Sequence, residues 1–283
     1  MSQHLDLKAE PTKKSKAGRN LPAAIGVGVV LGALVVIGLF YVPWLLVALA
    51  AAAAGVGTWE VVNGLNHKRG MGIPLPPAVL IAVALPFLAY IGGGQWLIFA
   101  VVASILFLIA CRLFGPKDGM IMSVMGSIFA VSWVPFMLAL AMLLFRDEGG
   151  PGKIFMILIM AIGNDTWGYI AGVLWGKHPM APKISPQKTW EGFAGSMVGS
   201  IIVGVIASLV IGEPWWFGVI LAVFLVATAT TGDLSESMVK REIGIKDMSN
   251  ILPGHGGVMD RLDSIVFCLA IGYVIFALFT PVT

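Results

Sequence analysis

Long apolar stretches separated by short polar breaks run along almost the whole chain. Each stretch has about 18 to 25 residues, enough for an α-helix to cross about 30 Å of hydrocarbon. Helices satisfy their own backbone hydrogen bonds in lipid, and the stretches are too long for membrane strands. The pattern therefore predicts an all-α fold, a polytopic transmembrane helical bundle with about nine spans. We expect the spans at residues 21–41, 43–62, 74–91, 95–111, 120–145, 154–175, 193–212, 214–231 and 264–280.

Composition supports this fold class and limits the number of domains. Hydrophobic residues occupy 58% of the 283 positions and charged residues 12%, which excludes an ordinary soluble domain. We expect a basic tail at residues 1–20 and a single transmembrane domain at residues 21–283. The tail either binds anionic lipid head groups or serves as a disordered orientation anchor.

The basic residues predict which ends of the spans face the cytoplasm. With nine spans, sixteen of the 18 Lys and Arg residues lie on the side of the N-terminal tail, and only Arg146 and Lys153 lie on the other. Loops rich in Lys and Arg stay on the cytoplasmic side. The tail and two long polar segments, residues 176–192 and 231–263, are therefore predicted to be cytoplasmic.

The second polar segment concentrates charge in a chain that is otherwise poor in it. If the stretch after Gly232 is helical, Asp233, Ser237, Lys240 and Arg241 share one helix face. A carboxylate and two cations would then converge at the membrane surface.

A glycine-rich run and two aspartates follow in the same segment. Residues 254–257 read Gly-His-Gly-Gly, which lets the backbone adopt positive φ and approach a phosphate closely. Asp260 and Asp263 are three residues apart, so they share one face just before the last span. Carboxylate oxygens of this kind suit Mg²⁺.

These residues together form a pattern with more than a dozen specified positions over about 27 residues. The pattern consists of Ser237, Lys240, Arg241, Lys246, Asp247, Ser249, Leu252, Pro253, His255, Gly256, Gly257, Asp260, Arg261 and Asp263. It resembles the signature of the phosphatidate cytidylyltransferases. The basic tail and the number of spans also resemble bacterial integral-membrane members of that family.

The first polar segment contains a second element that is similar to this family, Ser-Pro-Gln-Lys-Thr-Trp-Glu-Gly from Ser185. Ser185 followed by Pro186 is typical of an N-cap and first helical residue, so we expect a helix to begin there. Its free N–H groups, with Lys183 and Lys188 beside them, would suit a triphosphate. An ordinary interfacial helix start with snorkelling lysines is the alternative.

Asp165 lies near the middle of an apolar span, where an ionised carboxylate costs at least about 2.5 kcal/mol unless it is paired or faces a cavity. The family has a similar Asp-Thr-x-Ala-Tyr run, but Gly168 stands here in place of Ala. Asp165 is therefore either part of a substrate site or buried against a partner from another helix.

The resemblance implies transfer of the cytidylyl group of CTP to phosphatidic acid, giving CDP-diacylglycerol and pyrophosphate. It implies Mg²⁺ as the cofactor, with room for a second metal ion. We expect catalytic roles for Asp233, Lys240, Arg241, Asp260 and Arg261. The expected metal ligands are Asp233, Asp260 and Asp263. The expected substrate contacts are Lys183, Ser185, Lys188, Ser237, Lys246, His255, Gly256, Gly257 and Asp165.

The expected partners are CTP, phosphatidic acid and the lipid bilayer, with no nucleic acid. The expected location is the plasma membrane, with the N-terminus and active site cytoplasmic. The spacing of Gly195 and Gly199 suits close helix contact, either within the chain or across a homodimer.

Two other functions compete with this interpretation. A secondary transporter would also carry an intramembrane aspartate and glycine-interrupted helices, but inverted repeats are not evident. An enzyme that consumes CDP-lipids would carry an Asp-Gly-x-x-Ala-Arg motif, which is not present. Glu60 is predicted to be an interfacial carboxylate without a catalytic role.

Overall fold

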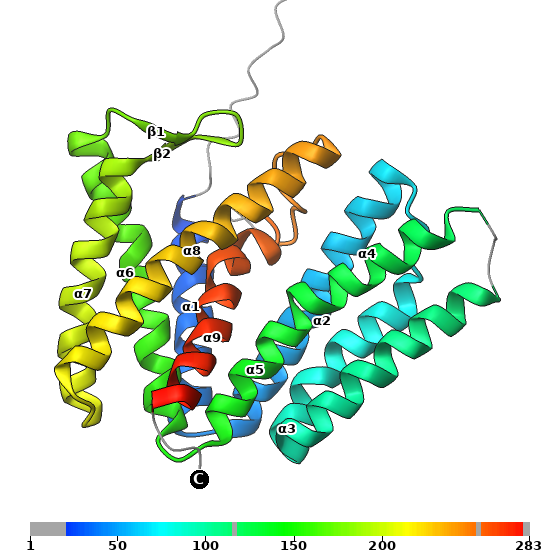
Figure 1. The fold of residues 1–283 in the computed structure, drawn as a ribbon, viewed down its shortest axis with the longest axis horizontal. Helices are drawn as coiled ribbons and strands as arrows, with labels where there is room; N and C mark the ends of the chain where they lie inside the picture. Colours follow the sequence, from blue (N-terminus) through cyan, green and yellow to red (C-terminus); the bar gives the residue numbers. More distant parts are fainter. Residues whose placement is uncertain (1–20, 115–117, 253–255, 280–283) are drawn as a thin grey trace, which may run out of the picture.

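The computed structural model describes residues 21–114, 118–252 and 256–279. The predicted basic tail and His255 lie outside these residues. The helices are α1 Leu21–Phe40, α2 Pro43–Arg69, α3 Leu75–Leu113, α4 Met120–Trp133, α5 Pro135–Arg146, α6 Gly150–Trp175, α7 Trp190–Ile211, α8 Trp215–Ile243 and α9 Met259–Phe279 (Figure 1). The strands are β1 Pro179–Ala181 and β2 Ser185–Thr189.

The predicted helical bundle is confirmed, and the number of spans depends on how α3 and α1 are counted. Within the described residues, seven helices are long and apolar enough to cross a membrane, with α4 and α5 taken together. α1 is an eighth apolar helix, and the part of it whose side chains are described, Ile25–Phe40, is shorter than the other seven. Both limbs of α3 must be counted to reach the predicted nine.

α3 is not one straight helix. Its 39 residues would extend about 58 Å at 1.5 Å per residue, far beyond the hydrocarbon thickness. Gly93 interrupts it with φ 73° and ψ −164°, a conformation that favours glycine. Figure 1 shows the chain doubling back there into two limbs, which correspond to the predicted spans 74–91 and 95–111.

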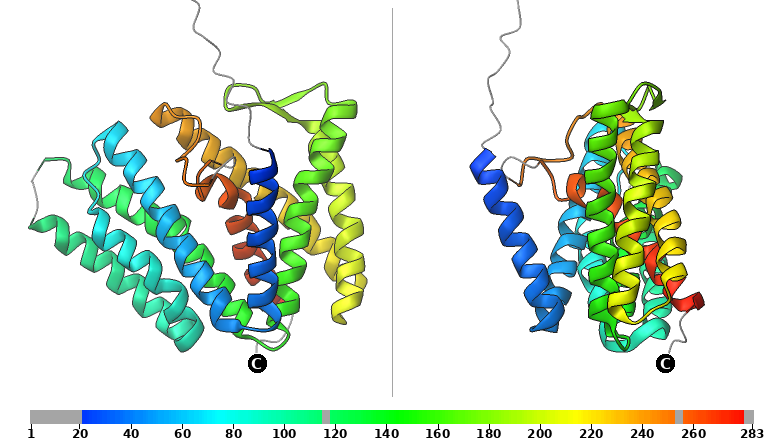
Figure 2. Two further views of the ribbon diagram at one scale, coloured as in Figure 1. Left: turned by 180° about the vertical axis from the view of Figure 1, so that it is seen from behind. Right: turned by 90° about the vertical axis from the view of Figure 1, so that its left-hand side faces the viewer.

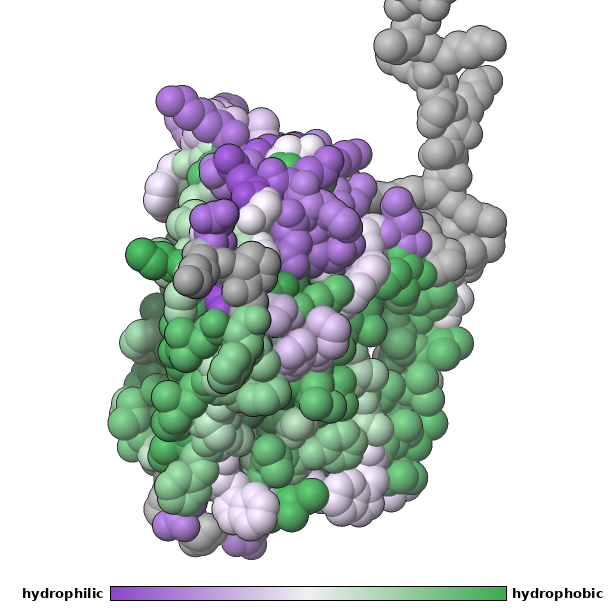
Figure 3. Space-filling view, turned by 90° about the vertical axis from the view of Figure 1, so that its right-hand side faces the viewer, coloured by the Kyte–Doolittle hydropathy of each residue, from purple (hydrophilic) through white to green (hydrophobic). Residues whose placement is uncertain are grey.

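The polar segments gather at one end of the bundle. The β-hairpin and the C-terminal end of α8 lie at that end, and the C-terminal end of α9 lies at the other (Figures 1 and 2). Figure 3 shows hydrophilic residues concentrated at the hairpin end and hydrophobic ones covering the sides below. The two polar segments therefore share one face, as the sequence predicts.

Glycines allow α6, α7 and α8 to pack closely. A Cβ at Gly218 of α8 would lie 2.2 Å from the carbonyl oxygen of Gly204 on α7. A Cβ at Gly195 would lie 2.2 Å from the side chain of Ala171, and one at Gly199 would meet the Trp167 ring. The predicted close contact of Gly195 and Gly199 is thus made within the chain, against α6.

The predicted helix start at Ser185 and Pro186 is wrong. Residues Ser185–Thr189 form β2, which pairs with β1 in an antiparallel hairpin. α7 begins at Trp190, where the Thr189 hydroxyl accepts the N–H of Gly192 at 3.1 Å and caps the helix. The Ser-Pro pair is typical of a helix start, but here it lies in a strand and Thr189 provides the cap.

Candidate active site

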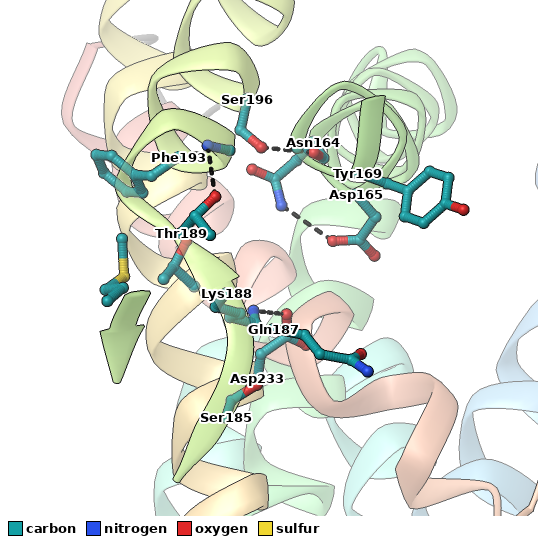
Figure 4. A pocket seen from close by; sticks show the side chains of 14 residues that line it. Asn164, Asp165, Tyr169, Ser185, Gln187, Lys188, Thr189, Phe193, Ser196 and Asp233 are labelled. Atoms are coloured by element: carbon teal, nitrogen blue, oxygen red, sulfur yellow. Dashed lines mark hydrogen bonds and ion pairs between the residues drawn. The ribbon is translucent and has the colours of Figure 1, made fainter. Parts of the chain in front are cut away.

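A cavity of about 280 Å³ opens between α6, the hairpin, α7 and α8 at the polar end. Asn164 and Asp165 reach it from α6, Lys188 from β2, Ser196 from α7 and Asp233 from α8 (Figure 4). Close packing of α6 against α7 supports this arrangement, since the Ser196 hydroxyl donates to the Asn164 carbonyl oxygen at 2.6 Å. The cavity therefore joins both predicted polar segments and the intramembrane Asn-Asp pair.

An ion pair between Lys188 and Asp233 crosses the cavity. The two residues are 45 positions apart in the chain, and both side chains are partly exposed to the cavity. The structure thus brings together a predicted phosphate-binding lysine and a predicted metal ligand.

Asp165 faces the cavity and is not buried against another helix. Its Oδ1 accepts a hydrogen bond from the Asn164 Nδ2 at 3.1 Å, and it lies within electrostatic range of Asp233, Lys188 and Arg261. Asn164 itself is buried, and its Oδ1 has no hydrogen-bond partner among the described residues. An ordered water, a ligand donor or a cation would satisfy that oxygen.

A second charged group lies where α8 meets α9. The Lys240 Nζ donates to Glu236 Oε2 at 3.0 Å and to Asp260 Oδ1 at 2.8 Å. The Asp260 Oδ2 accepts the backbone N–H groups of Gly257 at 2.8 Å and Met248 at 2.9 Å. Buried charges require such partners, so Asp260 fixes both Lys240 and the loop before α9.

Asp263 connects the two charged groups. Its carboxyl group interacts with those of Asp233 and Glu236 on α8. Gly232 makes this approach possible, because a Cβ there would lie 2.4 Å from the Asp263 carbonyl oxygen. Of the α8 face predicted from the sequence, Asp233 and Lys240 thus contact the two aspartates of α9, and Arg241 is exposed.

The acidic residues fit a divalent cation that also binds substrate phosphates. Among the described residues, no three His, Cys, Asp or Glu side chains are arranged to hold a metal ion by themselves. Mg²⁺ commonly takes one or two carboxylates and completes its octahedron with water and phosphate oxygens. Asp233 lines the cavity together with Asn164, whose Oδ1 is unpartnered among the described residues, and Asp263 lies beside Asp233, so donors of this kind are present.

The profile of the cytidylyltransferase family matches residues 22–279. The chain belongs to this family. A phosphatidate cytidylyltransferase of Mycobacterium bovis is 39% identical over 281 residues, covering 94% of this chain and 92% of the relative. One from Mycobacterium leprae is 38% identical over 268 residues, covering 89% and 86%. One from Bacillus subtilis is 39% identical over 136 residues, covering 47% and 51%.

The other predicted site residues lie at the same polar end with different exposures. Ser185 lines the cavity, and Ser237 is half-buried on α8. The exposed cations, which do not line the cavity, are Lys183, Arg241, Lys246 and Arg261. Arg261 interacts electrostatically with Asp165.

The glycines of the signature have distinct uses. Gly256 adopts φ +83°, as predicted for a loop near phosphate, and its N-terminal neighbour His255 lies outside the described residues. A Cβ at Gly257 would lie 2.6 Å from an oxygen of Glu60. The second glycine thus leaves room for a carboxylate from α2.

Sequence reasoning missed Glu60, Glu191 and Glu236. Glu60 lies next to the second polar segment, at the end of the span where the sequence placed it, but it is 1% exposed, so its burial against protein donors was not predicted. Glu191 accepts the N–H groups of Lys177 and His178, at 3.1 and 3.2 Å, and closes the base of the hairpin. The sequence held one clue to all three residues. An acidic residue within or beside an apolar span is costly unless it has a partner, so each of them should have been expected to bind another group.

Proposed function

We propose that this chain transfers the cytidylyl group of CTP to phosphatidic acid, releasing pyrophosphate and leaving CDP-diacylglycerol in the membrane. The observation that carries the proposal is the joining of Lys188, Asp233 and Asp263 at the polar end of an apolar bundle. Family membership and the names of the relatives support the choice of substrates.

In the proposed reaction, a phosphate oxygen of phosphatidic acid attacks the α-phosphorus of CTP. The new P–O bond forms as the bond to the β-phosphate breaks, and pyrophosphate leaves with the electron pair. The attacking phosphate monoester is already largely ionised near neutral pH, because its second pKa is about 6 to 7. No protein nucleophile or general base is required.

The obstacle to this reaction is repulsion between two anions, so the cations of the site must provide most of the catalysis. Lys188 reaches into the cavity from β2, where it would contact the triphosphate. Lys240 is held by Glu236 and Asp260, which orients its charge. Arg241 and Arg261 lie exposed at the same end, where a guanidinium suits two phosphate oxygens at once.

Asp233 and Asp263 are the proposed holders of Mg²⁺, with Asn164 across the cavity. Asp260 also remains a proposed ligand, since a carboxylate has about four lone-pair sites and three donors from the described part of the chain occupy them. A bound divalent ion would orient the triphosphate and neutralise charge on the leaving pyrophosphate. This ion, like a second one, is a proposal from the donor chemistry.

An apolar groove beside the charged groups suits the lipid substrate. It has a volume of about 250 Å³ and is lined by residues of α4, α5, α8 and α9. Ser235 of α8 contributes to it, two positions after Asp233. A lipid whose acyl chain lay in this groove would hold its head group near the charged end of α8.

The proposed location is the plasma membrane, with the polar end facing the cytoplasm. The support is the distribution of the Lys and Arg residues, sixteen on that side against two. Nucleotide and Mg²⁺ are available there. A homodimer remains a proposal that crosslinking in native membranes would test.

The decisive experiment is turnover by protein purified in detergent. Phosphatidic acid and CTP should give a CDP-lipid and pyrophosphate only when a divalent cation is present. Each of the four ribonucleoside triphosphates should be offered, and phosphatidic acid should be replaced by diacylglycerol. Equal rates with diacylglycerol would refute the assignment of the phosphate oxygen as the attacking atom. Equal rates with another nucleotide would refute only the assignment of cytosine as the base. A transporter would give no pyrophosphate.

A further inference from the structure

Glu60 is a buried carboxylate of α2 whose partners all lie on the segment that leads into α9. Its Oε1 accepts the Ser249 hydroxyl at 2.5 Å and the Val258 N–H at 2.9 Å, and its Oε2 accepts the Met259 N–H at 2.7 Å. No basic side chain forms an ion pair with it within the described part of the chain. Three hydrogen bonds from one segment therefore account for its burial.

These contacts place a negative charge at the N-terminus of α9. The first N–H groups of a helix have no partner inside the helix, and the helix dipole favours an anion beside them. Glu60 takes the N–H groups of Val258 and Met259, and Asp260 takes that of Gly257. Two carboxylates, one from α2 and one from α9, thus satisfy three successive donors.

The same two carboxylates hold both described ends of the segment. Glu60 joins Ser249 to Val258 and Met259, while Asp260 joins Met248 to Gly257. Between them, the Leu252 N–H donates to the Gly256 carbonyl oxygen at 2.9 Å. These bonds close the segment at two places, and Glu60 and Lys240 hold it from outside residues 248–260.

The consequence reaches the proposed site through Asp260. Asp260 can bind Lys240 at 2.8 Å only if the start of α9 is held at the right distance from α8. Glu60 fixes that start from α2, and Gly257 leaves it the necessary space. Outer carboxylates of this kind commonly change activity by about 10- to 100-fold when they are removed.

We propose that Glu60 is a positioning residue for cytidylyl transfer, which anchors Ser249, Val258 and Met259 to α2 and thereby sets the positions of Asp260 and Lys240. This inference rests on the proposed function. Glu60 is not a catalytic residue, because its side chain contacts protein donors only and does not line the cavity.

The test begins with a measurement that needs no turnover. A nitroxide is attached to cysteine in Ile251→Cys, at an exposed position of the segment, after Cys111→Ser and Cys268→Ala remove the native thiols. Glu60→Gln keeps the size of the side chain but puts an amide N–H where an acceptor is needed. The spectrum should show greater label mobility in Glu60→Gln and, to a lesser degree, in Ser249→Ala.

Thr58→Val is the matched control, because Thr58 is equally buried on the same helix and its hydroxyl has no hydrogen-bond partner among the described residues. It should leave the spectrum unchanged. A label at Gln187→Cys in the hairpin should not respond to Glu60→Gln.

The kinetic arm uses the same variants with their native cysteines. Glu60→Gln should lower kcat by about 10- to 100-fold and change the KM for CTP by less than about twofold. Ser249→Ala should have a smaller effect, and the double variant should be no worse than Glu60→Gln because both remove one contact network. Ser249→Ala also keeps the inference testable if Glu60→Gln fails to fold.

Two results would overturn the inference. An unchanged spectrum in Glu60→Gln would show that Glu60 does not anchor the segment. A changed spectrum with wild-type kcat would show that Glu60 anchors the segment without affecting cytidylyl transfer. Wild-type protein that makes no CDP-lipid would instead overturn the proposed function and the kinetic consequence drawn from it. The spectra are independent of that outcome, so the two failures can be distinguished.

Discussion

Replacing Gly232 by alanine should separate the two helices that carry the acidic residues. Gly232 precedes Asp233 on α8, and a Cβ there would lie 2.4 Å from the Asp263 carbonyl oxygen and 2.9 Å from the Phe267 ring. Ordinary contacts of this kind begin at 3.4 Å. The carbonyl belongs to the backbone of α9 and cannot rotate away, so the helices must move apart by about 1 Å to restore a normal contact.

The magnitude follows from this displacement. Overpacking a close helix contact costs about 1 to 3 kcal/mol of stability. A misplacement of about 1 Å in a catalytic site costs about 100-fold in rate, equivalent to about 2.7 kcal/mol of transition-state stabilisation. Gly232→Ala should therefore lower kcat about 100-fold in a protein that still folds.

The assay is the initial rate of CDP-lipid formation at saturating CTP, with the unfolding temperature measured on the same sample. Gly32→Ala on α1 is the matched control, because a Cβ there meets no atom within 4 Å, and it should retain wild-type turnover. Folded Gly232→Ala with a wild-type rate would refute the requirement for close contact between Asp233 and Asp263.

Three further predictions concern the carboxylates, the metal and the topology. Asp233→Asn or Asp260→Asn should reduce turnover by about 10³-fold or more, equivalent to about 4 kcal/mol, without preventing membrane insertion. Near-normal rates would remove that residue from the proposed ligands. Chelation with EDTA should abolish pyrophosphate release and added Mg²⁺ should restore it, and activity that persists after chelation would contradict the metal proposal. In a background without native cysteines, single cysteines at Gln187 and Met248 should be labelled only from the cytoplasmic side and one at Gly149 only from outside. Labelling of Met248 and Gly149 from one side would refute the nine-span topology.

The helical bundle was predictable because the membrane leaves few alternatives. A chain in lipid must satisfy its backbone hydrogen bonds within each span, so apolar runs identify the helices directly. The division of α3 was predictable for the same reason, since Gly92, Gly93 and Gly94 interrupt the run just where a second span must begin. The clustering of the two polar segments at one end then follows from an alternating direction of the spans.

The hairpin was not predictable from local signals. Ser185 and Thr189 both suit an N-cap, and the sequence offered no local reason to choose the later one. The choice depends on pairing with β1 and on the Trp190 N–H, which donates to the His178 carbonyl oxygen at 3.0 Å. These contacts join residues that are distant in the segment, so helix-start preferences alone could not reveal them.

Glu60 shows the same limit over a longer distance. Its partner Ser249 is 189 positions away, and nothing next to Glu60 in the chain requires an anion. The high cost of a buried carboxylate was the available clue, but the predicted span ended close enough to Glu60 for water to explain it. α2 in fact continues to Arg69, which places Glu60 two and a half turns inside the helix.

The structure also separates two lysines that the sequence placed in one group. Lys188 pairs with Asp233 at the cavity, where both side chains remain partly exposed and a triphosphate can compete for the lysine. Lys240 pairs with Glu236 and Asp260, whose side chains are 0% and 4% exposed. Losing Lys240 would leave two buried carboxylates without their cation, which is strongly destabilising, whereas losing Lys188 would leave Asp233 beside an open cavity. Lys240 therefore stabilises the fold in addition to any phosphate contact, and of these two lysines Lys188 is the one whose ion pair a substrate phosphate can reach.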